Sequence, residues 1–361
     1  NKNEPIGHVP FQLNNTSQNE PVEFGLTFWA ITGGRYEKFI YNIKISGNHI
    51  EKEELLQYKT NQPTSIFERT LENGQSVIVF NKRLKVPALT RNEITIKCLP
   101  NISVLAAYRQ VNTIIDDLEI PTAYLENKIS FPMVGARELF PEEFDINESG
   151  LKGSVLEFLQ EADFNIVDVV KQEIEHIDFR NINISTKVEE SYNVFLDFST
   201  KRPKPDKAKV FDILSGGDSG LRFVQGIKTD KGTEEFVFYD NMESDGTLRT
   251  FRLAGYIYQI IQRGGFIAID EIESPLHPKL VEFIIEKFLK MSGDEQMLFT
   301  THYDGLLAQE DLIRKDNIWF TSKNEQGVSE LYPLTDFTGL NRLASIQRAY
   351  QAGKFGAIPN I

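Results

Sequence analysis

Two apolar strands in the last third of the chain constrain its fold most strongly. The segment FIAIDE (266–271) is an apolar run that ends in two acids, and QMLFTTH (296–302) is a second, mainly apolar run that ends in two threonines and a histidine. Between them, PKLVEFIIEKFLKM (278–291) has apolar residues at helical spacing. Strands without polar alternation are buried on both faces, and helices between such strands are typical of a largely parallel sheet. The sequence therefore predicts an α/β core with both strands ending at one edge of the sheet.

The polar residues at these strand ends are candidates for catalysis. Ligands of open α/β sheets bind at the carboxyl ends of the strands, and adjacent buried acids are costly unless they hold a cation or a proton. In a nucleotide hydrolase, Asp270 would hold water on Mg²⁺ and Glu271 would orient the attacking water. His302 could donate a hydrogen bond to a γ-phosphate and link it to the catalytic carboxylate. The alternative interpretation is an acidic turn and a structural histidine.

Two glycine-containing segments compete for contact with a phosphate. LSGGDSG (214–220) and ESDGTLR (243–249) both place serine beside glycine. Only the second precedes a predicted helix, of about 15 residues, and that helix leads directly into FIAIDE. Ser244 and the amide of Gly246 would then lie at a helix amino terminus, where unpaired N–H groups and the helix dipole favour an anion. We therefore predict that ESDGTLR contacts nucleotide and that LSGGDSG is a loop without that role.

The first third of the chain has a different pattern. Strand-like runs at 22–31, 35–45 and 49–58 are separated by turn-forming residues such as Gly33-Gly34. From about residue 100, apolar residues recur at helical spacing instead. The sequence thus predicts an antiparallel β region followed by helices.

Charge and cysteine content narrow the class of protein. The formal net charge of -13 opposes non-specific binding to nucleic acid. A basic, proline-broken stretch, KRPKPDKAK (201–209), is interpreted as a solvated linker, with a phosphate-contacting patch as the alternative. The single cysteine, Cys98, excludes an internal disulfide and fits a reducing cytoplasm. No apolar run reaches the roughly 18 residues that span a bilayer, so we expect a cytoplasmic protein without membrane contact.

The order of these motifs resembles the second half of an ABC-class ATPase core, the class that includes the SMC proteins. ESDGT stands as the signature, FIAIDE as Walker B, IESPLHP as the D-loop, and His302 as the switch histidine. A closer resemblance is to the AAA/ABC-class ATPases of bacterial abortive-infection and related anti-phage loci. That resemblance also includes an early PFQL (10–13), a closing DNIWF (316–320) and the tail RAYQAGKFGAIP.

The resemblance implies a fold, cofactors and site residues. The implied fold is α/β, an ABC-ATPase-like core with a mostly parallel sheet, an antiparallel β lobe at 1–99, a helical insertion at 100–176, and a core lobe at 177–361. The implied cofactors are ATP and Mg²⁺. The implied site residues are Glu271 and His302 for catalysis, Asp270 for the metal, and Ser244, Gly246, Thr247 and Ser274 for the nucleotide.

The resemblance also implies a mode of action. Two protomers, or a higher oligomer, would hold ATP between them and control a separate effector, a nuclease or toxin, in response to a phage-derived trigger. The phosphate loop G-x-x-x-x-G-K-[ST] does not occur in these 361 residues. With the start at Asn1, this predicts a missing upstream segment, and weak ATP binding by the chain alone. The alternatives are a non-hydrolysing scaffold that binds a partner protein and an SMC-like DNA-clamping ATPase, which the negative charge and the lack of a long heptad repeat disfavour.

Overall fold

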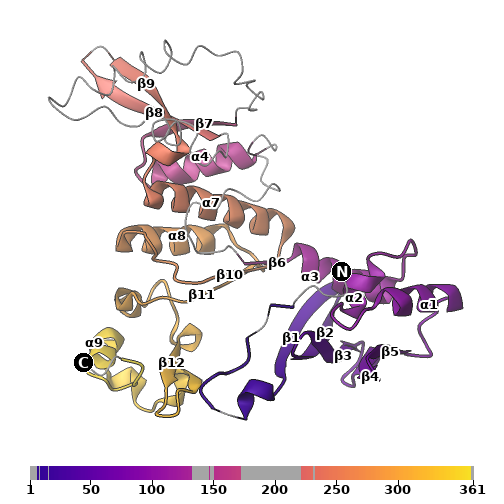
Figure 1. Cartoon of the computed structure of the whole chain (residues 1–361). Helices are drawn as coiled ribbons and strands as arrows, with labels where there is room; N and C mark the ends of the chain where they lie inside the picture. The colour runs from indigo at the N-terminus through magenta and orange to yellow at the C-terminus, as the bar shows by residue number, and fades with distance from the viewer. Residues whose placement is uncertain are drawn as a thin grey trace, which may run out of the picture. The chain divides into compact units, whose positions relative to one another are not determined.

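The chain divides into two compact units (Figure 1). The first consists of Asn1–Ile129 together with Arg314–Ile361, and the second of Ser130–Ile313. In this computed structural model the described residues are 6–7, 9–14, 16–131, 146, 150–171, 221–230 and 232–358. The predictions for LSGGDSG (214–220) and KRPKPDKAK (201–209) concern residues outside these ranges.

The first unit is built on a five-stranded antiparallel sheet. Its strands follow one another in sequence order: β1 (Val22–Thr32), β2 (Arg35–Ser46), β3 (His49–Tyr58), β4 (Thr64–Glu72) and β5 (Gln75–Phe80). Two-residue turns join consecutive strands, except that a five-residue loop joins β3 to β4. Gly33 and Gly34 both have positive φ, the backbone conformation that a two-residue hairpin turn requires and that glycine adopts without steric cost. The antiparallel β region predicted from the sequence is confirmed.

Three helices cover one face of this sheet. They are α1 (Ala88–Lys97), α2 (Val104–Tyr108) and α3 (Asp116–Asn127). Alternation along β1 decides which side chains meet them: Phe28 is buried in the core, whereas Trp29 is 55% exposed on the other face. The core that results contains buried aliphatic and aromatic side chains from sheet and helices, including Phe39, Leu55, Phe67, Ile94 and Leu118.

A buried carboxyl lies within this core. Glu53 on β3 is fully buried and accepts hydrogen bonds from the backbone N–H of Val104, at 3.0 and 2.9 Å from its two oxygens, and from the Tyr41 hydroxyl at 2.9 Å. Glu53 therefore caps the amino terminus of α2. Burial, the largest influence, raises the pKa of Glu53 to about 7, and the hydrogen bonds and the Arg69 guanidinium oppose that rise.

The carboxyl-terminal part of the first unit forms a hairpin and a short helix. Strands β12 (Trp319–Lys323) and β13 (Ser329–Pro333) pair antiparallel, and α9 (Ile346–Gln351) follows. The ring of Phe320 stacks on those of Tyr350 and Phe355, with centroids 5.6 and 5.5 Å apart, and this stacking fixes the tail against the hairpin.

The second unit carries the apolar strands. Its elements are β6 (Ile129–Ser130, which begins at the boundary), α4 (Leu151–Glu161), β7 (Ile166–Lys171), β8 (Leu221–Thr229), β9 (Gly232–Tyr239), α7 (Asp245–Arg263), β10 (Phe266–Ile269), α8 (Pro278–Met291) and β11 (Gln296–Phe299). Short 3₁₀ helices lie at Ser17–Asn19, Lys315–Asn317, Leu334–Asp336 and Leu340–Arg342 in the first unit, and at Asp240–Met242 and Asp304–Ala308 in the second.

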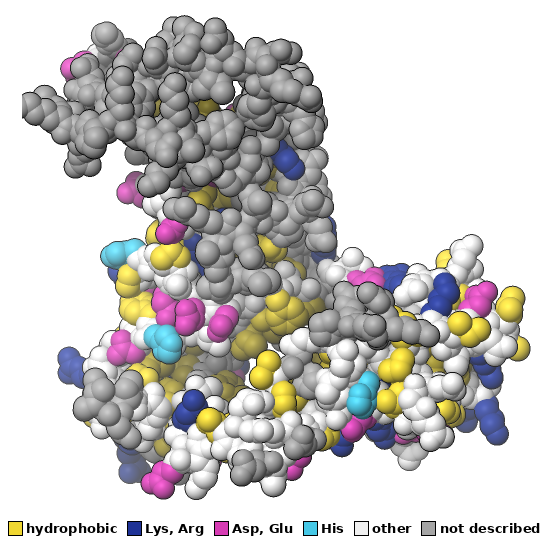
Figure 2. All heavy atoms as spheres, viewed as in Figure 1, with side chains coloured by type: hydrophobic (Ala, Val, Ile, Leu, Met, Phe, Trp, Pro, Cys, Tyr) yellow, Lys and Arg dark blue, Asp and Glu magenta, His cyan; other side chains and the backbone are white. Residues whose placement is uncertain are grey.

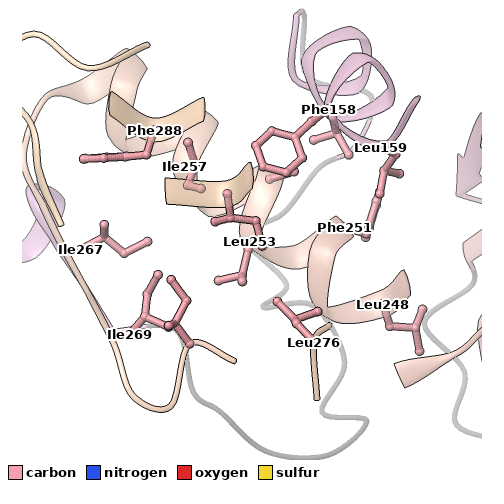
Figure 3. Close-up of a cluster of buried hydrophobic side chains, with 14 of the residues drawn as sticks. Phe158, Leu159, Leu248, Phe251, Leu253, Ile257, Ile267, Ile269, Leu276 and Phe288 are labelled. Atoms are coloured by element: carbon pink, nitrogen blue, oxygen red, sulfur yellow. The ribbon is translucent and has the colours of Figure 1, made fainter. Parts of the chain in front are cut away.

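One hydrophobic core joins these elements (Figure 3). Leu253 and Ile257 of α7 pack with Ile267 and Ile269 of β10, and Phe288 of α8 belongs to the same cluster. All five side chains are at most 3% exposed. The core therefore fixes β10 beneath the two helices, with its carboxyl end open to the site described below.

The prediction of a mostly parallel sheet is wrong for the described residues. Strands β10 and β11 are parallel and in register from Phe266↔Gln296 to Ile269↔Phe299, but their sheet has three strands, in the order β11-β10-β6, so β11 lies at its edge. Strands β7, β8 and β9 form an antiparallel sheet, because β8 and β9 are joined by a hairpin turn and β9 (GTEEFVFY) is not a continuous apolar run. The domain boundaries expected at 99 and 176 stay a prediction.

Candidate functional site

The parallel register brings the two strand ends together. Asp270 directly follows β10 and Thr300 directly follows β11, and the last paired residues are Ile269 and Phe299. The Thr300 hydroxyl donates a hydrogen bond to the Asp270 carboxylate and accepts one from the backbone N–H of Glu271 at 2.8 Å. Thr300 therefore holds both members of the predicted acidic pair.

Glu271 has an unusual backbone conformation. Its φ is +45°, a region that residues other than glycine rarely adopt and that often marks functional sites. Hydrogen bonds on both sides hold the turn: Ile272 N–H donates to the Thr300 carbonyl at 3.0 Å, and Ser274 N–H donates to the Glu271 carbonyl at 2.9 Å. Asp270 and Glu271 are both exposed. Their carboxylates can thus meet a hydrated ligand without the cost of burial.

The histidine after β11 is connected to the same turn by a third acid. The backbone N–H of His302 donates to Glu273 Oε1 at 2.6 Å. Burial, the largest influence on Glu273, would raise its pKa, but the His302 N–H and the Thr301 hydroxyl, with smaller contributions, bring the pKa below its usual value. Glu273 is therefore an ionised acceptor that joins the two strand ends. Figure 2 shows acidic and histidine side chains together on the visible face at the level of β10 and β11.

Thr300 and Glu273 are functional candidates that the sequence interpretation missed. Both lie inside motifs that drew attention, FTTH and IESPLHP. Their roles depend on the pairing of β10 with β11, because the hydrogen-bonded residues are 28 to 31 positions apart in the chain.

The start of α7 is the second predicted contact. Ser244 is its N-cap, and the Ser244 hydroxyl accepts from the backbone N–H of Thr247 at 3.0 Å. The two hydroxyls are also 2.8 Å apart. Thr247 is buried, whereas Ser244 is exposed. In this arrangement Ser244 can reach a ligand, and the Thr247 side chain serves the helix.

Gly246 faces the turn that carries Ser274. A Cβ atom at Gly246 would lie 3.7 Å from Ser244 Oγ and 3.9 Å from the Pro275 carbonyl oxygen, ordinary van der Waals distances. Its φ is not positive, so neither packing nor backbone conformation in this chain requires glycine, although glycine costs a helix about 1 kcal/mol relative to alanine. The first turn of α7 and the turn after β10 are therefore neighbours, with a space between them that a Cβ would narrow.

A buried cation lies one turn further along α7. Arg249 is 7% exposed, and its Nε and Nη2 atoms have no hydrogen-bond partner within the described part of the chain. Burial, and then the nearby Arg252, lower the pKa of Arg249. Desolvation of a guanidinium is costly unless it is paired, and no described residue hydrogen-bonds these two atoms.

The donor set fits a nucleotide-bound Mg²⁺. Magnesium keeps several waters and takes one or two protein carboxylates together with substrate phosphates, and Asp270 supplies one exposed carboxylate beside a hydroxyl. Among the described residues there is no group of three or more His, Cys, Asp or Glu side chains that could hold a metal ion.

Parallel strands ending in Asp-Glu and Thr-Thr-His, beside a serine-capped helix, fit the class of AAA/ABC-type ATPases. A family model described as "AAA domain, putative AbiEii toxin, Type IV TA system" matches residues 128–308, just over half of the chain. The protein belongs to this family, and the predicted likeness to abortive-infection ATPases is confirmed. The match includes every predicted site residue.

The chain is also similar to a number of solved structures. Solved structures similar to this chain include "Crystal structure of the SmcHead bound to the C-winged helix domain of ScpA", at 14% identity and a TM-score of 0.29, over 82% of this chain and 74% of that one. No curated protein sequence matches the chain. Within its described residues, no helix is both long and apolar enough to cross a membrane.

Proposed function

We propose that this protein hydrolyses ATP and that the ends of β10 and β11 form the hydrolytic half of its site. The observation that carries the proposal is the hydrogen bonding of Asp270, Glu271 and Thr300 at adjacent ends of two parallel strands. Asp270 would hold Mg²⁺, which would neutralise charge on the phosphates when bound with ATP. Membership of the AAA family supports nucleotide as the ligand.

Glu271 would accept a hydrogen bond from the attacking water and orient it. Its exposed carboxylate is an acceptor, and the hydrogen bond from its N–H to Thr300 fixes its backbone. His302, also exposed, would donate to the γ-phosphate through its imidazole. Glu271 would thus position the water and His302 would stabilise charge on the phosphate, the two contributions that phosphoryl transfer requires.

Ser244 and Gly246 would contact the nucleotide held by a second protomer. Ser244 is exposed at the start of a 19-residue helix, whose amino-terminal N–H groups and dipole attract phosphate. Ser274 lies in the turn beside Gly246 and would join this contact. A head-to-tail pair of protomers would couple dimerisation to nucleotide binding.

The output would be control of a separate effector. The family's description names a putative toxin and a type IV TA (toxin–antitoxin) system, which supports a nuclease or toxin partner in the cytoplasm, released by a phage-derived trigger. A non-hydrolysing scaffold remains a second candidate, because the sequence contains no G-x-x-x-x-G-K-[ST].

Turnover and pairing of the natural protein test this proposal. Glu271→Gln should keep ATP binding, trap the dimer and lower hydrolysis by about 100-fold or more. Ser244→Arg should block ATP-driven pairing, whereas Ser215→Arg in LSGGDSG is the matched control. Unchanged turnover in the Glu271 variant would refute its role, and ATP binding without hydrolysis by the wild type would favour the scaffold.

A further inference from the structure

Hydrogen bonds connect the turn after β10 with the segment after β11. Three of them involve Thr300: its hydroxyl bonds Asp270 and the Glu271 N–H, and its carbonyl accepts from the Ile272 N–H. Another runs from the His302 N–H to Glu273 Oε1, at 2.6 Å. Thr300 positions the two acids, and the hydrogen bond between the His302 N–H and Glu273 connects their turn to the histidine.

Glu273 is well suited to hold a backbone amide. Its side chain is partly buried, and its second oxygen, Oε2, is buried without a hydrogen-bond partner in the part of the chain that the structure describes. A hydrogen bond from an amide to an ionised carboxylate is about twice as strong as one between neutral groups. The His302 amide therefore has a strong and directional anchor.

The next residue has an anchor of its own. The Tyr303 hydroxyl donates to Glu282 Oε1 on α8 at 2.8 Å, and the Tyr303 N–H donates to the Thr301 hydroxyl at 3.0 Å. The backbone of His302 thus lies between two fixed points, one on the turn after β10 and one on α8.

We propose that Glu273 is a positioning residue: its carboxylate holds the backbone of His302 beside the Asp270–Glu271 pair, so that the imidazole meets the reacting phosphate at a fixed distance from both acids. The catalytic part of this proposal rests on the ATP hydrolysis proposed above. Its structural part, the hold on the His302 amide, stands independently of nucleotide.

Hydrogen exchange tests the structural part on the 361-residue chain. Glu273→Ala removes the acceptor, so the His302 amide should exchange about tenfold faster or more. Glu273→Gln keeps an acceptor oxygen without the charge, and its exchange should lie between those of Ala and wild type. Glu286→Gln is the matched control, because Glu286 lies on α8 and pairs with Lys290 away from this turn. It should leave the His302 amide unchanged.

Steady-state hydrolysis by the natural protein tests the catalytic part. Glu273→Ala should lower kcat about tenfold with KM within about twofold, and Glu273→Gln should recover part of that loss. Unchanged exchange at His302 in both folded variants overturns the proposal. Faster exchange with unchanged kcat overturns its catalytic part. If the wild type itself does not hydrolyse ATP, the proposed function has failed, and the exchange result alone decides the role of Glu273.

Discussion

Replacing Glu53 by glutamine should change how the stability of the first unit depends on pH. Burial raises the pKa of the Glu53 carboxyl from 4.5 to about 7, so the folded state binds this proton more tightly than the unfolded chain does. Between pH 4.5 and about 7 the unfolded chain releases its proton first, and the free energy of unfolding falls as the pH rises. Above about pH 7 both states are ionised and the loss is complete.

The size of the effect follows from the two pKa values. Their difference, 7 minus 4.5 or about 2.5 pH units, corresponds to roughly 3 kcal/mol at 1.36 kcal/mol per unit. Glutamine keeps the shape of the side chain and an oxygen that can accept from the Val104 N–H, but it has no proton to lose. The Glu53→Gln variant should therefore match the wild type near pH 4.5 and exceed its stability by up to about 3 kcal/mol at pH 8.

Denaturant unfolding followed by tryptophan fluorescence reports on this unit selectively. The chain has two tryptophans, and both Trp29 and Trp319 belong to the first unit. Unfolding curves at half-unit steps from pH 4.5 to 8.5 would give the two pH profiles. Glu54→Gln is the control, since Glu54 lies on the opposite face of the same strand, and its profile should run parallel to that of the wild type. If the Glu53→Gln profile also ran parallel to the wild type, the reasoning from burial would be refuted.

Three other substitutions test the local contacts of Thr300, Arg249 and Gly246 through their effect on stability, and the last also through ATP-driven pairing. Thr300→Val removes the hydroxyl that holds Asp270 and Glu271, and we expect a loss of about 1 kcal/mol in chemical denaturation, with Thr300→Ser as the conservative rescue. Arg249→Met replaces a buried guanidinium whose Nε and Nη2 atoms have no hydrogen-bond partner among the described residues, and it should raise stability by about 1 kcal/mol or more; a loss of several kcal/mol would show instead that the arginine has a strong partner. Gly246→Ala should raise the thermal midpoint slightly, because alanine is the better helix former and its Cβ fits. The same variant should weaken ATP-driven pairing, and equal pairing would argue against a nucleotide contact there.

The sequence predicted the features that depend on local patterns. In FIAIDE and QMLFTTH, an apolar run followed by polar residues predicts a buried strand with polar side chains at its end. Ser244 and the helical periodicity after it predict the serine cap of α7. The roles of Thr300 and Glu273 depend on which residues of β10 and β11 face each other. That register arises from tertiary pairing, so no local pattern contained it.

The extent of the parallel sheet was overestimated for a related reason. Two apolar strands with a helix between them define one parallel pair, and the neighbours of that pair are set by the rest of the chain. Strand β9 pairs antiparallel with β8 because a tight turn joins them. Thr247 shows a similar limit: the sequence predicts it as a nucleotide contact, and the structure adds that its amide and hydroxyl hydrogen-bond Ser244 in the cap of its own helix.

The edge position of β11 has a practical consequence for handling the protein. Leu298 on this strand is 58% exposed, and β11 ends the sheet in the described part of the chain. A short apolar strand with open backbone groups is a template for addition of a strand from another molecule, which leads to aggregation. Concentrated solutions should therefore scatter light increasingly with time. A lysine at position 298 would act as a gatekeeper charge and keep the chain in solution without touching the polar residues at the end of the strand.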